Sequence, residues 1–116
     1  MRLLSLTLIM LGMSSAAMAG AEFHPSTYTT YMQHPPYKGY VKLLSDLPQD
    51  EASYTEIGMV RIDVDEVRGF DDAMDRLKAM AAQHGGMAII PDDDARMMAS
   101  GATPKNATAT AVILNN

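Results

Sequence analysis

The sequence predicts a two-layer α+β domain in which one main helix packs on a mostly antiparallel sheet of about four strands, in the order ββαββ. Apolar and polar residues alternate over 54–64, the period of a strand with one wet side. An apolar stripe with helical spacing runs over 71–84. Two glycines follow it, and the apolar run 87–90 then returns the chain to the sheet. We place this domain at residues 39–116.

The first two strands are expected at 40–44 and 54–64, with a turn at 48–50 between them. In the second strand, one face carries Gly58, Val60, Ile62 and Val64, and the other carries Arg61, Asp63 and Asp65. Gly58 stands in mid-strand, where a glycine indicates a β-bulge or the close approach of another backbone.

The helix is expected to begin at Asp71, whose side chain can cap it, and to end at the glycine pair that follows His84. Its apolar stripe consists of Phe70, Met74, Leu77 and Ala81, flanked by Ala73 and Met80. A polar loop over 92–105 leads to the last strand, 107–114. Alternate alanines in that strand allow the helix to lie close to the sheet.

Residues 1–19 have the features of a secretory signal peptide: one positive charge at Arg2, an apolar run, and small residues that end in an A-x-A site at Ala19. The apolar run is shorter than the ~20 residues that span a bilayer as a helix. A second A-x-A site permits cleavage after Ala21 instead. We therefore expect an exported protein, periplasmic or secreted.

The charge and the absence of cysteine exclude several classes of partner. The chain has 14 acidic against nine basic residues and a net charge of −5, with no cluster of Lys and Arg, which disfavours nucleic acid and anionic membrane surfaces. It has no cysteine, so disulfides and a lipidated membrane anchor are not expected. A small domain of this kind must be held by packing or by self-association.

Residues 20–38 are expected to form an extended arm, because Pro25, Pro35 and Pro36 hold the backbone near polyproline II and few aliphatic side chains are available to bury. Four tyrosines are candidate anchors for docking this arm on the domain or on a partner: Tyr28, Tyr31, Tyr37 and Tyr40.

Two segments carry a resemblance to known families. Residues 54–60, YTEIGMV, resemble a Y-x-x-I/L-G-x-V strand, and residues 85–90, GGMAII, resemble a GA-[ND]-A-[VI]-[IL] strand after a helix. Over 40–114 the chain resembles small bacterial envelope domains related to the Rcs stress-sensor lipoprotein and to the YbjQ-like heavy-metal-binding family. The resemblance implies a strand–helix–strand unit and a role in envelope stress. The lipidated cysteine and the disulfides of the Rcs sensor have no counterpart here, and no metal-ligand set can be matched.

Methionine and histidine provide a candidate copper site, because thioethers select Cu(I). Met97 and Met98 form the one methionine pair without an expected core role, and His24 and His84 are the candidates to complete the site. Core packing is the alternative role for methionine. Cleavage after Ala21 would place His24 third in the chain, where the amine, two amides and the imidazole chelate Cu(II) or Ni(II) in a plane.

Two acidic clusters, 63–66 and 92–94, are candidates for a Ca²⁺ site if they meet at one end of the sheet. Neither has the spacing of a calcium-binding loop, and a solvated charged loop is the alternative.

The sequence has no Cys nucleophile, no G-x-S-x-G elbow and no H-E-x-x-H helix, so we do not expect an enzyme and expect no cofactor other than copper. We expect a non-catalytic periplasmic interaction module that contacts an envelope protein or its own copies. Its binding element is the arm or a sheet edge such as 40–44, which bears Lys42. The alternative is a periplasmic metal-binding protein, for Cu in preference to Ca.

Overall fold

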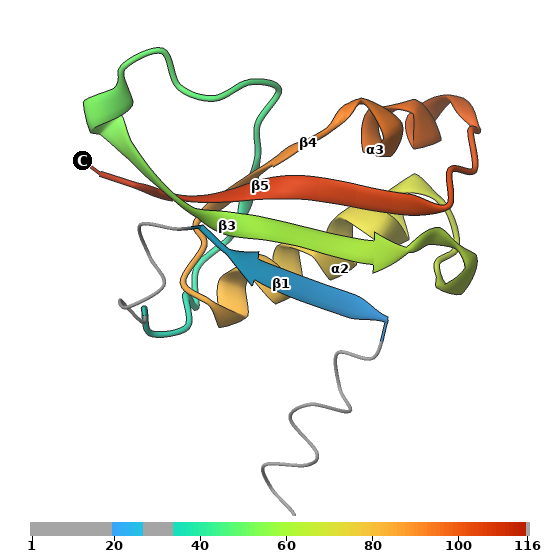
Figure 1. Cartoon of the computed structure of the whole chain (residues 1–116), viewed down its shortest axis with the longest axis horizontal. Coiled ribbons are helices and arrows are strands. Elements are labelled where there is room, and N and C mark those ends of the chain that lie inside the picture. Colours follow the sequence, from blue (N-terminus) through green and yellow to red (C-terminus); the bar gives the residue numbers. More distant parts are fainter. Residues whose placement is uncertain (1–19, 27–33, 116) are drawn as a thin grey trace, which may run out of the picture.

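A five-stranded sheet with the strand order β1-β3-β5-β4-β2 forms the centre of this computed structural model (Figure 1). The structure describes residues 20–26 and 34–115. The strands are β1 (Ala21–Pro25), β2 (Lys42–Leu43), β3 (Tyr54–Asp63), β4 (Ala88–Pro91) and β5 (Asn106–Leu114). Neighbouring strands are antiparallel except β2 and β4, which are parallel. The mixed α and β fold is confirmed, but the sheet has five strands instead of about four. The exact ββαββ order is not confirmed, because β1 precedes it and α3 lies between its last two strands.

The additional strand, β1, lies within the segment 20–38 that was expected to be an arm. It pairs antiparallel with β3, with Phe23 opposite Val60. Phe23 packs against the core, whereas its neighbours Glu22 and His24 are exposed. This is the alternation of a half-buried strand, in a stretch that contains only one large apolar side chain. Pairing with β3 therefore determines the strand more than its own composition does.

Gly58 allows β1 to lie close against β3. The register between β3 and β5 shifts between Glu56 and Gly58, which is a β-bulge. A Cβ atom at position 58 would lie 2.5 Å from the backbone oxygen of His24. Both sequence-based readings of this glycine, the bulge and the close backbone approach, are confirmed.

The main helix, α2 (Phe70–Gln83), packs on one face of the sheet behind β3 and β5 in Figure 1. Its N-cap is Gly69, not the expected Asp71. Near the start of the helix, Arg68 N donates a hydrogen bond to the carboxylate of Asp72 at 2.9 Å. This hydrogen bond is the main cause of a lowered pKa of Asp72. The helix ends at Gln83, one residue before the expected end, and Gly85 after its C-cap adopts φ 93°, the role predicted for the glycine pair.

The sheet carries a core on each face. On the α2 face, the predicted helix stripe packs against the alanines of β5, which are buried as expected: Ala73, Met74, Leu77, Met80, Ala81, Ala107, Ala109 and Ala111. On the opposite face, which we call the outer face, a smaller core covers the β4 side of the sheet: Ala88, Ile90 and Val112, with Leu44, Tyr54 and Leu114 packed against them. The β1 side of the outer face has no such cover among the residues described.

The prediction of a polar loop over 92–105 is wrong for its first half, which forms a helix α3 (Asp93–Met97) and a 3-10 turn η4 (Met98–Ser100). Asp92 caps α3: its Oδ1 accepts from Ala95 N at 2.9 Å, and its Oδ2 accepts from the Thr108 hydroxyl. Asp is a preferred N-cap residue, so the three consecutive aspartates mark a helix start.

Residues 1–19, the predicted signal peptide, lie outside the described part of the chain. No helix within 20–26 and 34–115 is long and apolar enough to cross a membrane.

Candidate functional site

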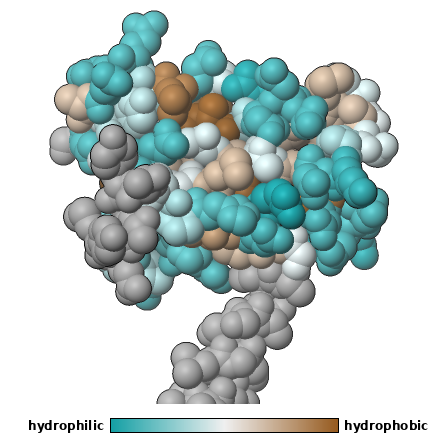
Figure 2. Space-filling view, viewed as in Figure 1, coloured by the Kyte–Doolittle hydropathy of each residue, from teal (hydrophilic) through white to brown (hydrophobic). Residues whose placement is uncertain are grey.

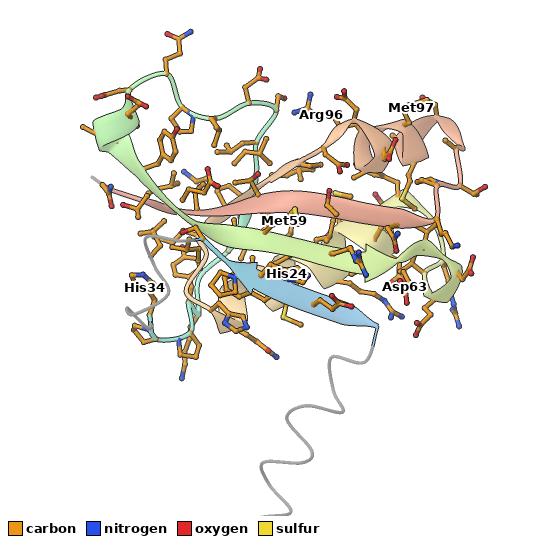
Figure 3. All side chains as sticks on the ribbon, in the orientation of Figure 1. His24, His34, Met59, Asp63, Arg96 and Met97 are labelled. Carbon is orange, nitrogen blue, oxygen red and sulfur yellow. The ribbon has the colours of Figure 1, made fainter. Side chains whose placement is uncertain are left out.

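The candidate site lies on β1 and on the adjoining part of the outer face. The strand register pairs Glu22 with Arg61 and His24 with Met59. Figure 2 looks onto this face and shows mostly hydrophilic side chains, with apolar atoms gathered near the segment that leads into β3. His24, Met59 and Asp63 are labelled on the strands of this face in Figure 3. Met59 has 41% of its surface exposed, which is unusual for a methionine on a sheet.

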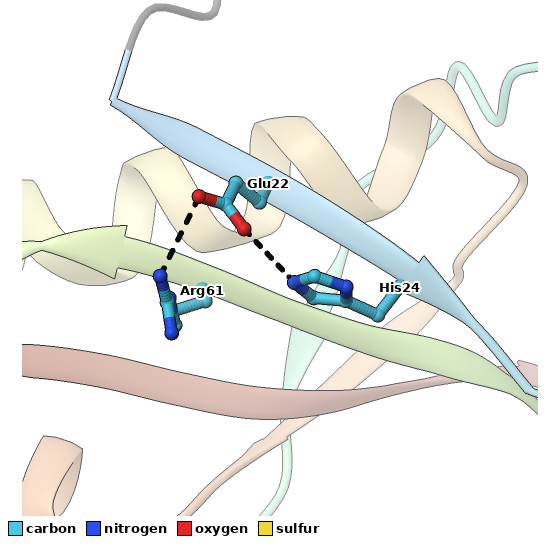
Figure 4. A network of polar contacts seen from close by, with 3 residues as sticks. All are labelled: Glu22, His24 and Arg61. Carbon is cyan, nitrogen blue, oxygen red and sulfur yellow. Dashed lines mark hydrogen bonds and ion pairs between the residues drawn. The ribbon is translucent and has the colours of Figure 1, made fainter.

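Three side chains of β1 and β3 form a polar network (Figure 4). The Nε2 atom of His24 lies 3.0 Å from Oε1 of Glu22, and Nη2 of Arg61 lies 3.5 Å from Oε2 of the same carboxylate. The side chains of all three are 40–53% exposed, and exposed pairs contribute only about 0–1 kcal/mol to stability. The network therefore arranges charge along β1 and adds little to the stability of the fold.

The backbone of β1 presents alternate polar groups to the two sides of the strand. Asp63 N donates to Gly20 O at 3.2 Å, and Ser26 N donates to Ile57 O at 3.0 Å. In an antiparallel pair such bonds recur at every second residue, so the backbone groups of Glu22 and His24 face β3. Those of Ala21 and Phe23, with the carbonyl of Pro25, face away. Since β1 is the last strand of the sheet, these groups have no strand partner within the described residues.

Phe23 and His84 stack beneath β1, on the α2 face. Their ring centroids are 3.9 Å apart and the rings are 5° from parallel. Burial lowers the pKa of His84 below its ordinary value of 6.5. Desolvation beside Phe23 therefore favours the neutral ring, although His84 stands at the C-terminus of α2, where a positive charge is ordinarily favoured.

The four residues predicted to bind copper do not meet in one place. His24 lies on the outer face of β1, whereas His84 stacks under the opposite face. Met97 is 57% exposed on α3, well away from His24 in Figure 3. Met98 is 6% exposed and belongs to the core, so the expectation that it lacks a packing role is wrong.

The other metal arrangements meet specific obstacles in this fold. The two acidic clusters do approach the same end of the sheet, because β3 and β4 run in the same direction. Both oxygens of Asp92 are taken up by the cap and Thr108, however. The planar chelate at His24 needs the amide that faces Met59, so it would require β1 to leave the sheet. Within 20–26 and 34–115, no group of three or more His, Asp or Glu side chains could hold a metal ion.

Two of the four predicted tyrosine anchors, Tyr37 and Tyr40, lie within the described residues. Tyr28 and Tyr31 lie outside the described residues. Tyr37 is half-buried against the core, and its backbone N donates to Ala82 O at 2.8 Å, which fixes this part of the segment on the end of α2. Tyr40 is 74% exposed, with Nζ of Lys78 5.0 Å from its ring centroid, a cation–π contact.

Sequence reasoning missed β1 and Met59 as components of a site. A signal for Met59 existed. The alternation over 54–64 places it on the same face as Arg61 and Asp63, so the pattern predicts an apolar side chain on the solvent-facing side of the strand. The signal for β1 was weaker, since a five-residue alternation that ends in proline also fits an extended arm.

Comparisons of the chain with protein-family models, with curated proteins and with solved structures give no match.

Proposed function

We propose that this protein is an exported, non-catalytic interaction module of the bacterial envelope that binds a protein strand along β1. The observation that carries this proposal is the row of outward-facing backbone groups at Ala21, Phe23 and Pro25 at the end of the sheet. An unpaired strand edge accepts an added strand through main-chain hydrogen bonds. The segment 1–19 supports an envelope location, because its composition is that of a signal peptide.

Two features favour β1 over the other sheet edge as the binding element. The opposite edge, β2, is two residues long and bears Lys42, and short strands and lysines are the usual means of blocking an edge. Strand β1 is five residues long and has no lysine. The resemblance to envelope stress domains agrees with a binding role and adds the expectation of a stress-related partner.

A photo-crosslinking residue at Pro25 in the cells that produce the protein tests this function. Pro25 is exposed at the end of β1, so a bound strand should be captured there. The matched control is the same residue at Glu51, exposed in the turn η2 (Glu51–Ser53), far along the chain from the edge. A discrete product at position 25 and none at position 51 is the expected result. Absence of any product at position 25 contradicts a binding role for this edge.

A second candidate function, Cu(I) binding, is favoured by one observation. His24 and Met59 are cross-strand partners on the exposed outer face, and imidazole and thioether are suitable copper ligands. The cation of Arg61 beside Glu22 opposes this function. Native mass spectrometry with added Cu(I) is the test: one bound ion that is lost in Met59→Leu supports the site, and binding unchanged by that substitution contradicts it.

A further inference from the structure

We propose that the strand seated on β1 is β1 of a second copy of this chain, so that two five-stranded sheets join into one continuous sheet across a twofold axis at Phe23. Self-pairing is a specific form of the binding function proposed above and rests on it. The occupant is identified by complementarity, because the five residues of β1 match their own sequence when it runs in the opposite direction.

The backbone determines which registers are available. The outward groups belong to the odd-numbered residues of β1, so an antiparallel partner must bring odd residues opposite odd residues. With Phe23 opposite Phe23 of the second copy, the two Phe23 residues exchange both N–H···O bonds. Ala21 N–H of each copy also reaches the carbonyl of Pro25 in the other. Pro25 lacks an N–H, and this removes one bond at each end.

The side chains then select one register. Centring the pair on Phe23 puts Glu22 of each copy opposite His24 of the other, on the exposed face where their side chains lie closest. Shifting the partner by two residues in one direction opposes Glu22 to Glu22, and shifting it in the other opposes His24 to His24. Two carboxylates directly opposite are unfavourable, whereas a carboxylate opposite an imidazole forms a hydrogen-bonded pair, as Glu22 and His24 do within one chain at 3.0 Å. The Phe23-centred register keeps four backbone hydrogen bonds, as does the Glu22-centred one, so the side chains decide in favour of the first.

The buried face of the joint adds apolar contact. Phe23 is only partly buried in one chain, where it stacks on His84 at 3.9 Å. Self-pairing places the two Phe23 rings side by side on the α2 face, and aromatic cross-strand pairs are favourable. Five residues make a small interface, so the association is of the weak and reversible class.

Two charge variants and their mixture test self-pairing. In a homodimer, Glu22→Lys removes the carboxylate opposite each His24, and His24→Glu puts two carboxylates opposite each other across the twofold axis. Mixed in equal amounts, they form a heterodimer in which the introduced lysine faces the introduced glutamate, and the native His24 of one copy faces the native Glu22 of the other. Sedimentation equilibrium from about 1 µM to about 1 mM covers the relevant dissociation constants. An ionic strength of about 0.15 M screens the net charge of −5 beyond about 8 Å.

We expect the wild-type chain to dimerise, each variant alone to dimerise at least about tenfold more weakly, and the mixture to recover most of the loss. Glu51→Lys is the charge-matched control and Lys42→Glu the control for the β2 edge, and both should dimerise as the wild type does. Circular dichroism establishes that all variants are folded. Both substitutions are at exposed positions. Recovery of dimerisation in the mixture therefore reports pairing between the two variants, not refolding of either one.

Self-pairing is overturned by a wild type that stays monomeric at about 1 mM, by variants that dimerise as well as the wild type, or by a mixture that recovers nothing. Weakening by Lys42→Glu overturns it as well, because the β2 edge is then the joint. A monomeric wild type that still crosslinks another envelope protein through position 25 removes self-pairing and leaves the binding function in place. Absence of both dimer and crosslink removes both.

Discussion

At the scale of single residues, Gly58 decides whether β1 can join the sheet. It lies in the β3 bulge, where the space that a side chain needs is occupied by the backbone of β1, with the oxygen of His24 2.5 Å from an added Cβ. Real Cβ atoms do not approach an oxygen so closely, so any side chain at this position must push β1 outward.

Gly58→Ala is therefore expected to lower the free energy of unfolding by about 1–3 kcal/mol. Urea denaturation followed by circular dichroism gives this quantity. Glu56→Ala, at an exposed position of the same strand, is the control and should change it by less than about 0.5 kcal/mol. Equal stability of Gly58→Ala and wild type would mean that β1 does not pass over this glycine.

His84 gives the fold a pH dependence through its contact with Phe23. Burial lowers its pKa below 6.5, so between the lowered value and 6.5 the unfolded chain binds more protons than the folded one. Stability contributed by the neutral ring is present above the unfolded pKa and is lost as the pH falls through 6.5 towards the folded pKa.

His84→Phe keeps an aromatic ring against Phe23 and removes the titration. The unfolding free energy of this variant should fall less between about pH 7.5 and pH 5 than that of the wild type. Gln83→Ala, an exposed and non-titrating position next to His84 at the end of the same helix, is the control and should leave the slope unchanged. A wild-type slope in His84→Phe would show that the partial desolvation of this imidazole beside Phe23 does not shift its titration.

At the scale of elements, α2 is the part that joins the two ends of the described chain into one core. Its buried stripe contacts β1, β3, β4 and β5, so it touches strands from both halves of the sequence. Leu77, fully buried at 0% exposure, lies in the middle of this stripe.

Leu77→Ala should lower the unfolding free energy by about 2–5 kcal/mol, because it removes buried methyl groups and leaves a cavity. Asp75→Ala, an exposed position on the same helix, is the matched control. Thermal and urea unfolding of the pair test the face assignment, and a melting temperature unaffected by Leu77→Ala would contradict it.

Sequence alone predicts the elements that are long enough to repeat the apolar spacing of a helix or a strand several times. Helix α2 has nearly four turns of apolar stripe and β3 ten residues, so each has a clear pattern and its observed bounds are close to the expected ones. Helix α3 has five residues and β1 five, which is too few to establish a period. Asp92 caps the first and pairing with β3 forms the second. The Asp92 cap is a local signal that the aspartates carry, whereas β1 depends on a tertiary partner that no local pattern reveals.

The candidate site follows the same division. His24 is a residue that the sequence identifies as chemically capable, but its neighbours Met59 and Arg61 are known only once the register of β1 on β3 is known. The predicted association of His24 with His84 and the Met97-Met98 pair fails because these residues lie on different faces and elements.

At the scale of the whole molecule, the sheet is asymmetric. Within residues 20–26 and 34–115, one face is closed by α2 and the other only on the β4 side, by Leu44, Tyr54 and Leu114. One edge is the two-residue strand β2 with Lys42, and the other is β1 with its outward backbone groups. The surface available for a protein strand is therefore concentrated at one end of the sheet, next to the polar network of Glu22.

Amide hydrogen exchange along β1, measured by NMR at low protein concentration, tests this account most directly. The amides of Glu22 and His24, which face β3, should be protected, and the amide of Phe23, which faces away from β3, should exchange rapidly. Raising the concentration should slow exchange at Phe23 alone among the three. Rapid exchange at His24 would show that β1 is not part of the sheet, and a Phe23 amide protected at every dilution would show that this edge is already covered.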